Sequence, residues 1–159
     1  MEKDFRELIK KNEGILTKII NLYSYSRADR DDLRQEILIQ LWKSFPKYKG
    51  NSRFSTWMYK VSLNTAITYI KKNSRNFKFV DYRPQIPDVI EENNPATIDD
   101  VKQLYSAISL LSKIDRAIVI LHLDKFAHKE IAEIIGVTER TLNVKLYRIK
   151  EKLKEILNN

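Results

Sequence analysis

Residues 54–72, FSTWMYKVSLNTAITYIKK, decide the fold, because their pattern predicts a long helix that is buried on most sides. In a helix over residues 53–75, at about 100° per residue, the polar and aromatic positions fall within an arc of about 80°. These positions are Arg53, Trp57, Lys60, Asn64, Thr68, Lys71 and Arg75. The rest of the circumference is mostly apolar, with Met58, Leu63 and Ile70 among its members. We therefore expect one narrow exposed stripe on an otherwise buried helix.

The exposed stripe carries the side-chain types that bind nucleic acid. Lys and Arg suit phosphates, the Asn64 amide suits a base edge, and the Trp57 indole can stack on a base. The surrounding block, residues 43–83, holds 10 basic side chains and 1 acidic one, interleaved with aromatic residues, whereas the whole chain has a net charge of only +8. This concentration of charge favours a nucleic-acid surface over a merely solvated basic face. Core packing of Trp57 stays open as an alternative.

Upstream of this block, the periodicity predicts two more helices. An N-terminal helix directs Leu8, Ile15 or Leu16, Ile19 and Tyr23 inward. A helix over residues 29–45, ended by Pro46, places Leu33, Ile37 and Leu41 on one face. Another face of that helix carries Asp29, Asp32, Glu36 and Gln40. This acidic face is either solvated surface or a contact for a basic partner.

Downstream, the stretch PQIPDVIEENNPATIDD, residues 84–100, changes the character of the chain. It holds five acidic residues, no basic ones and three of the four prolines, so it predicts a linker. We expect an all-α fold of two small helical domains, residues 1–80 and 101–159, joined by a linker over residues 81–100. Two short helices are expected at residues 101–111 and 113–123.

The last segment, residues 126–153, has the pattern of a helix-turn-helix. Ile131, Ala132 and Ile135 mark a short helix, Gly136 suits the left-handed turn that ends it, and Thr138 suits the cap of the next helix. That next helix buries Leu142, Leu146, Ile149 and Leu153. The second helix of such a motif enters the DNA major groove, although a plain helical hairpin remains the alternative. The candidate DNA-binding residues are Thr138, Arg140, Thr141, Lys145 and Arg148.

Three segments in order resemble the extracytoplasmic-function class of bacterial RNA polymerase sigma factors, in the sigma-70 family. DDLRQEILIQLWKSFPKY (31–48) looks like the family's polymerase-binding helix, FSTWMYKVSLNTAITYIKK (54–72) like its −10 helix, and KEIAEIIGVTERTLNVKLYRIKEKL (129–153) like its −35 helix-turn-helix. The resemblance implies sigma region 2 and region 4 folds. It also implies a role in promoter recognition and transcription initiation, and the partners core RNA polymerase (clamp coiled coil and flap), promoter DNA and a possible anti-sigma factor.

The resemblance also implies a role for each candidate residue. The polymerase-binding set is Asp31, Asp32, Leu33, Gln35, Glu36 and Gln40. The −10 DNA-binding set is Arg53, Trp57, Lys60, Asn64, Lys71 and Arg75. The −35 set is the five residues given above for the helix-turn-helix. Departures from the family pattern are Ala127 in place of a Ser cap, Asn143-Val144 in place of Lys-Ser, Leu63 before Asn64, and Thr68 at a position that is often acidic.

Composition and motifs argue against other classes of protein. The chain has no Cys, which excludes disulfides and thiol catalysis, and its charged start predicts no secretory signal. The longest clean apolar run, residues 117–121, is far shorter than the roughly 20 residues of a membrane helix. We expect a cytoplasmic protein without membrane insertion, catalytic residues, cofactor, metal or small-molecule substrate.

Two other functions remain as alternatives. One is a stand-alone helix-turn-helix regulator, which would bind a palindromic operator without polymerase. The other is an RNA-cleaving enzyme built on His122, His128 and Glu130, which lack a recognised metal-ligand spacing. His122 lies in an apolar run, so we expect it to be a core residue.

Overall fold

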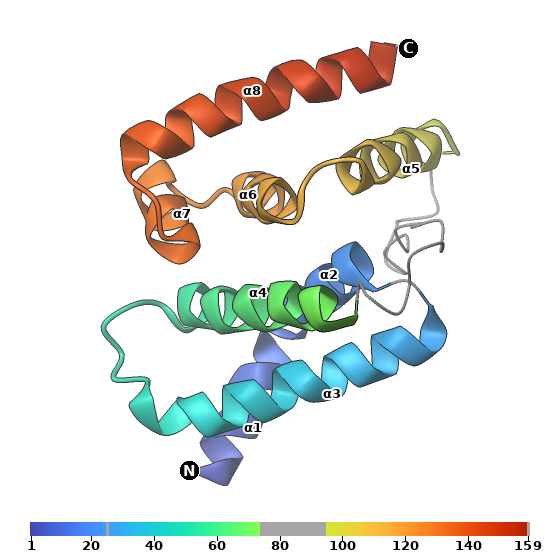
Figure 1. Ribbon diagram of the computed structural model, residues 1–159. Helices are drawn as coiled ribbons and strands as arrows, with labels where there is room; N and C mark the ends of the chain where they lie inside the picture. The colour runs from blue at the N-terminus through green and yellow to red at the C-terminus, as the bar shows by residue number, and fades with distance from the viewer. Residues whose placement is uncertain (25, 74–94, 159) are drawn as a thin grey trace. The chain divides into compact units, whose positions relative to one another are not determined.

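The computed structural model describes residues 1–24, 26–73 and 95–158, with the backbone alone at residues 73 and 95–98. In these ranges every element of regular structure is helical, so the predicted all-α fold is confirmed (Figure 1). The chain divides into two units, Met1–Asp81 and Tyr82–Asn159. None of the described helices is long and apolar enough to span a membrane.

The N-terminal segment forms two helices where one was expected. Helix α1 covers Glu2–Lys11 and helix α2 covers Glu13–Tyr23, with Asn12 between them. The Asn12 side-chain Nδ2 donates a hydrogen bond to the Leu8 carbonyl oxygen at 2.8 Å, and its backbone N–H donates to Ile9 at 3.1 Å. Such local bonds compete with the helical ladder and end it. The prediction of one continuous N-terminal helix was therefore wrong, because the chain breaks the helix at Asn12.

Helix α3, Arg27–Ser44, carries the predicted acidic and apolar faces. Leu33, Ile37 and Leu41 are completely buried, as the periodicity predicted. Asp29, however, does not belong to an exposed acidic face, because it is 7% exposed. Its backbone N–H donates to the capping hydroxyl of Ser26 at 3.2 Å, so it lies in the first turn of the helix. The 3-10 turn η1, Phe45–Lys47, follows directly and contains the predicted terminator Pro46.

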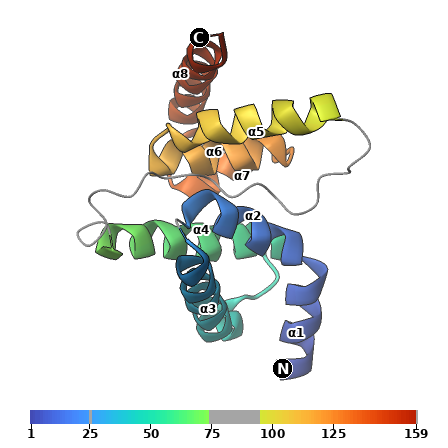
Figure 2. The same ribbon diagram turned by 90° about the vertical axis from the view of Figure 1, so that its right-hand side faces the viewer.

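Helix α4, Phe54–Asn73, packs against both α2 and α3. Figure 2 shows α4 lying across α3, with α2 beside both. Met58, Tyr59, Leu63 and Ile70 are buried along its length. The predicted burial over most of the circumference of this helix is confirmed, and α4 forms the centre of the core of this unit.

The first helix of the second unit begins inside the predicted linker. Helix α5 covers Pro95–Ser109, so residues 95–100 are helical although they were assigned to the linker. Pro is tolerated in the first turn of a helix, where its missing N–H has no helical partner to lose. Helix α6 covers Lys113–Leu123 as predicted, and the Ser112 hydroxyl caps it by accepting from the Asp115 N–H at 3.2 Å.

The helix-turn-helix is present in the second unit. Helix α7, His128–Ile135, ends at Gly136, which has a φ of 86°, and helix α8 covers Glu139–Asn158. Gly136 takes the predicted left-handed turn, and the Thr138 hydroxyl caps α8 as predicted by accepting from the Thr141 N–H at 3.1 Å. The buried residues of α7 are Ile131, Ala132 and Ile134, so Ile134 takes the core position expected of Ile135. Helices α5, α6 and α7 all pack on α8.

Candidate functional site

The predicted stripe on α4 is exposed as a continuous row. Arg53, Lys60, Asn64, Thr68 and Lys71 are all solvent-exposed, whereas the intervening Met58, Leu63 and Ile70 are buried. Arg75 lies outside the described residues. Basic and amide side chains therefore lie together along one side of a helix whose other sides are fixed by packing.

Trp57 occupies the edge of this stripe and is only half-buried. Its ring centroid lies 5.2 Å from Tyr48, 5.3 Å from Phe54 and 6.2 Å from Phe45. The Tyr48 hydroxyl donates to the Ser52 carbonyl oxygen at 2.6 Å and so fixes the loop before α4. Trp57 thus has a packing role, as the alternative held, while part of its indole remains accessible for stacking.

A polar groove lies between α3 and α4. It has a volume of about 470 Å³ and is lined by Glu36, Gln40, Asn64, Thr65, Thr68, Tyr69 and Lys72. The Gln40 side-chain amide donates to the Glu36 carboxylate at 3.2 Å. Two residues of the predicted polymerase-binding set, Glu36 and Gln40, are therefore brought together with Asn64 of the predicted DNA-binding set.

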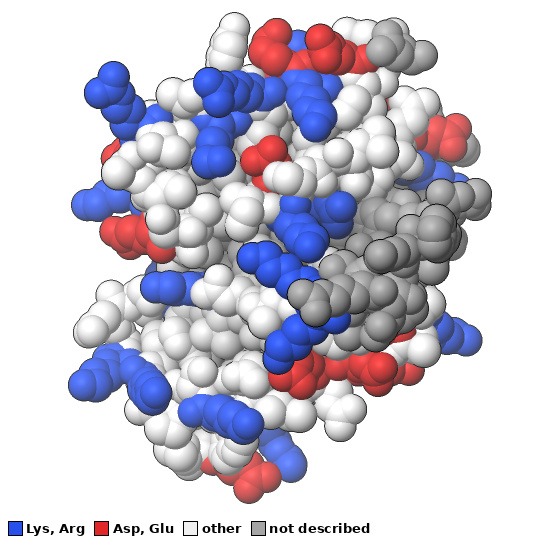
Figure 3. Space-filling model, in the orientation of Figure 1, with Lys and Arg blue, Asp and Glu red and all other residues white. Residues whose placement is uncertain are grey.

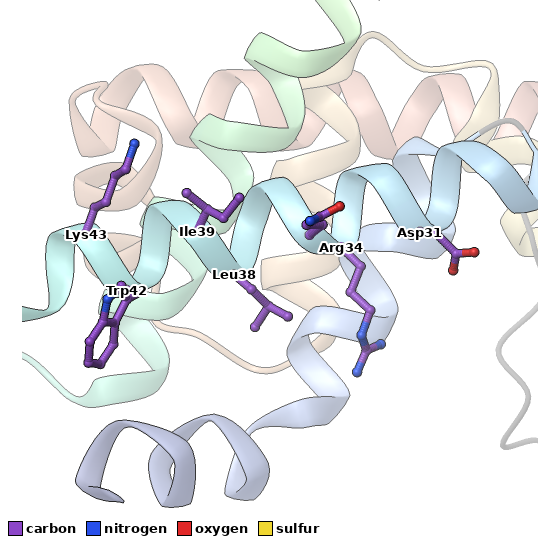
Figure 4. A pocket seen from close by; sticks show the side chains of 7 residues that line it. Asp31, Arg34, Leu38, Ile39, Trp42 and Lys43 are labelled. Carbon is purple, nitrogen blue, oxygen red and sulfur yellow. The ribbon is translucent and has the colours of Figure 1, made fainter. Parts of the chain in front are cut away.

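A second groove, of about 420 Å³, lies on α3 itself. Its lining residues are Asp31, Arg34, Gln35, Leu38, Ile39, Trp42 and Lys43. In the view of Figure 4, Trp42, Leu38 and Arg34 project from one edge of this surface and Ile39 and Lys43 from its other edge. We name this surface, together with the exposed neighbour Asp32, the α3 face. It combines predicted polymerase-binding residues with apolar side chains.

Exposure along α3 differs in two ways from what the predicted polymerase-binding set assumes. Leu33 is 0% exposed, so its side chain supports the core and cannot contact a partner. Ile39 and Trp42, which the sequence reasoning missed, are 39% and 42% exposed. The signal was present, because α3 has more apolar positions than the Leu33, Ile37 and Leu41 row can bury. Arg34 is tied to α2 by an ion pair with Glu13 at 2.8 Å.

The exposed side of α8 carries most of the predicted −35 residues. Arg140, Thr141 and Arg148 are exposed, whereas Lys145 is half-buried. The Thr138 hydroxyl accepts from the Thr141 N–H at 3.1 Å and donates to the Thr141 hydroxyl at 2.8 Å, so it is engaged in capping. Basic side chains are spread over the visible face of each unit, including α8 (Figure 3).

The two histidines are close to each other beside α8. Their ring centroids are 5.9 Å apart, and His128 Nδ1 lies 2.9 Å from Asn143 Oδ1. Partial burial lowers the pKa of His122 below its ordinary value of 6.5, and the charge of Lys150 and the nearby His128 act in the same direction. The expectation of a core His122 was wrong, because the side chain is partly exposed. Among the described residues, no group of three or more acidic or histidine side chains could hold a metal ion.

Comparison with known proteins shows which family models and relatives this chain resembles. The chain matches "Sigma-70 region 2" over residues 8–76 and "Sigma-70, region 4" over residues 102–153. It is 24% identical to the ECF RNA polymerase sigma-E factor of Haemophilus influenzae, over 96% of this chain and 87% of that protein. It is 25% identical to the factor of the same name from Escherichia coli K12, over 94% of this chain and 84% of that protein.

Two solved structures share the fold. The sigma factor RpoE of Bartonella quintana, crystallised with the anti-sigma factor NepR, superposes with a TM-score of 0.79 at 20% identity and 98% coverage of both chains. CnrH in complex with the cytosolic domain of CnrY gives a TM-score of 0.69 at 16% identity, over 99% of this chain and 90% of that chain.

The chain belongs to the sigma-70 family of RNA polymerase sigma factors, in its extracytoplasmic-function class. It is a non-enzymatic factor that binds core RNA polymerase and directs promoter-specific initiation of transcription.

Proposed function

We propose that the α3 face is the surface by which this sigma factor binds core polymerase. An apolar centre of Ile39 and Trp42 with a polar rim of Asp31, Asp32 and Gln35 has the composition of a protein interface core and rim. The acidic part of this rim, Asp31 and Asp32, is complementary to a basic surface such as the clamp coiled coil, which favours rapid association. The face also carries Lys43 and Arg34, of which Arg34 is paired with Glu13. The exposure of Ile39 and Trp42, about two to three turns along α3 from these carboxylates, is the observation that carries the proposal.

The exposed stripe of α4 then binds the −10 element. Arg53, Lys60 and Lys71 can neutralise phosphates, and Asn64 can contact a base edge. The accessible part of the Trp57 indole stacks on an unpaired base, which offsets the few kcal/mol that unpairing costs. Glu36 and Gln40 lie in the polar groove beside Asn64, so we assign them to the boundary between the polymerase and DNA surfaces.

The exposed side of α8 binds the −35 element as the recognition helix of the helix-turn-helix. Arg140, Thr141 and Arg148 face outward and Lys145 lies at the edge of that surface. Thr138 contributes by capping the helix, which fixes the direction from which α8 enters the groove. We assign the flap of core polymerase as the second docking partner, bound by this unit.

The same surfaces offer a means of inhibition. RpoE and CnrH were both solved with a second protein, and NepR is named an anti-sigma factor. We propose that an anti-sigma factor restrains this chain by covering the α3 face. We also propose that the chain works in the cytoplasm, where core polymerase is found.

Transcription in vitro tests the proposal. The full chain and core RNA polymerase are combined, and a promoter is selected from a random DNA library by run-off transcription. We expect a bipartite promoter with two conserved elements and loss of transcripts with the double variant Asp31→Lys, Asp32→Lys. The matched control Asp4→Lys, Glu7→Lys reverses two exposed charges on α1 and should transcribe normally. Equal transcription by both double variants would contradict the assignment of the α3 face.

A further inference from the structure

An aliphatic side chain lies exposed in the middle of the −35 surface. Val144 is 47% exposed on α8, whereas Leu142, Leu146 and Ile149 of the same helix are buried. A single exposed apolar residue is ordinary on a protein surface. Val144 differs because of its neighbours, which are the polar and basic residues of the DNA-binding side.

The helical positions place Val144 at the centre of that side. At about 100° per residue, Val144 lies about 40° from Arg140 and about 40° from Arg148, between the two. Thr141 lies about 20° beyond Arg148. All four side chains are exposed. A DNA duplex that touches both arginines therefore also covers Val144. The position of these side chains is fixed, because the other side of α8 is packed on α6 and α7.

The chemistry of this position restricts what Val144 can contact in DNA. Its isopropyl group cannot form hydrogen bonds, so it gains nothing from the donors and acceptors of base edges. In the major groove, the one apolar group is the C5-methyl of thymine, which apolar side chains contact. Arginines on either side can hold the neighbouring phosphates or guanines and so press the valine against the base.

We infer that Val144 is a specificity-determining residue that selects thymine at one position of the −35 element through its C5-methyl group. The inference rests on the proposed role of α8 as the −35 recognition helix. It goes beyond that role because it commits to one base, one atom and one side chain. Burying a methyl group contributes about 0.8 kcal/mol, which corresponds to about a fourfold preference.

Replacing thymine by uracil tests the inference, since uracil lacks only this methyl group. Holoenzyme is formed from the full chain and core polymerase, and its affinity is measured for the selected promoter with each −35 thymine changed to uracil in turn. We expect one substitution to weaken binding of the unchanged protein about fourfold. The variant Val144→Ala, whose side chain reaches less far into the groove, should show a smaller preference for thymine over uracil at that position.

The stability of the test variant and one matched control make the result specific. Val144→Ala replaces an exposed β-branched residue by the best helix former, so it should not unfold α8. Leu157→Ala removes another exposed aliphatic side chain of α8, 44% exposed and about 140° around the helix from Val144, and should keep the full preference for thymine.

Each other outcome has a defined meaning. A selected −35 element without thymine, no uracil-sensitive position, or an unchanged preference in Val144→Ala would each overturn the inference while leaving −35 recognition by α8 intact. If the holoenzyme shows no dependence on any −35 sequence, the proposed role of α8 itself fails.

Discussion

His128 Nδ1 and Asn143 Oδ1 lie 2.9 Å apart, which joins the first residue of α7 to the recognition helix α8. Helix α7 lacks a side-chain cap, because Ala127 stands at its N-cap position. The contact between His128 and Asn143 therefore adds a polar link where the usual capping bond is missing. It orients the two helices of the motif without providing any chemistry of its own.

This relationship predicts a small effect for the variant His128→Ala. Loss of one exposed hydrogen bond should lower the free energy of unfolding by about 1 kcal/mol or less. Transcription should remain nearly intact, because the histidine does not act on a substrate. Thermal unfolding and run-off transcription measure the two effects. Complete loss of transcription by a folded variant would restore the idea of a functional histidine site.

A second prediction concerns the pH dependence of stability in the second unit. Burial lowers the pKa of His122, so between that lowered value and 6.5 the unfolded chain binds more protons than the folded chain. Stability should therefore be fully present above pH 6.5 and decline as the pH falls below it. Urea unfolding between pH 7.5 and 5.5 measures the slope, and the variant His122→Gln should flatten it. An unchanged slope in that variant would assign the effect to other groups.

Trp57 gives a prediction that separates packing from DNA contact. Trp57→Ala removes three aromatic contacts of a half-buried ring, so the free energy of unfolding should fall by about 2 kcal/mol. Opening of the −10 region, followed by permanganate reactivity of its thymines, should be slowed while closed-promoter binding persists. Trp57→Phe should restore part of both properties. Normal opening by Trp57→Ala would leave the residue with packing alone.

Substitution of Arg148 should change how strongly the affinity for promoter DNA depends on salt. If its guanidinium neutralises one phosphate, Arg148→Ala should reduce the slope of log affinity against log salt by about 1. The control Arg6→Ala removes an arginine of α1 that is paired with Glu2 at 3.0 Å, and its slope should equal that of the unchanged protein. A weaker affinity with an unchanged slope would indicate a base contact by Arg148 instead.

Substitution of Gly136 and of Gly14 by alanine should change the free energy of unfolding in opposite directions. Gly136 has a φ of 86°, so Gly136→Ala should cost about 1–2 kcal/mol through the left-handed backbone, although no atom lies within 4 Å of the added carbon. Gly14 lies in α2 with the same free space, so Gly14→Ala should stabilise by about 0.5 kcal/mol. Urea unfolding of both variants checks the sign, and a stabilising Gly136→Ala would contradict the assigned turn.

Much of the fold followed from periodicity. The rows Leu33, Ile37, Leu41 and Leu142, Leu146, Ile149 are buried as predicted, because helical spacing places them on one side whatever they pack against. Leu153, predicted to extend the second row, is only half-buried. Boundaries depended on single local bonds and were less predictable. Asn12 divides the first helix through a side-chain bond to Leu8, and Pro95 begins a helix inside the expected linker.

The candidate sites were predicted less completely, because exposure depends on neighbouring helices. Periodicity could not place Asp29 in the core or leave Ile39 and Trp42 at the surface. Likewise, only packing of α3 on α4 brings Gln40 beside Asn64. A single helix predicts which residues share a side, whereas the partner helices determine which side is covered.

Co-elution with core RNA polymerase on a sizing column tests the central claim most directly. The unchanged chain and the control Asp4→Lys, Glu7→Lys should co-elute with polymerase at equal stoichiometry. The double variant Asp31→Lys, Asp32→Lys should bind roughly tenfold more weakly, because it reverses the acidic rim of the α3 face. Elution of the unchanged chain apart from polymerase, at micromolar protein and low salt, would contradict the account.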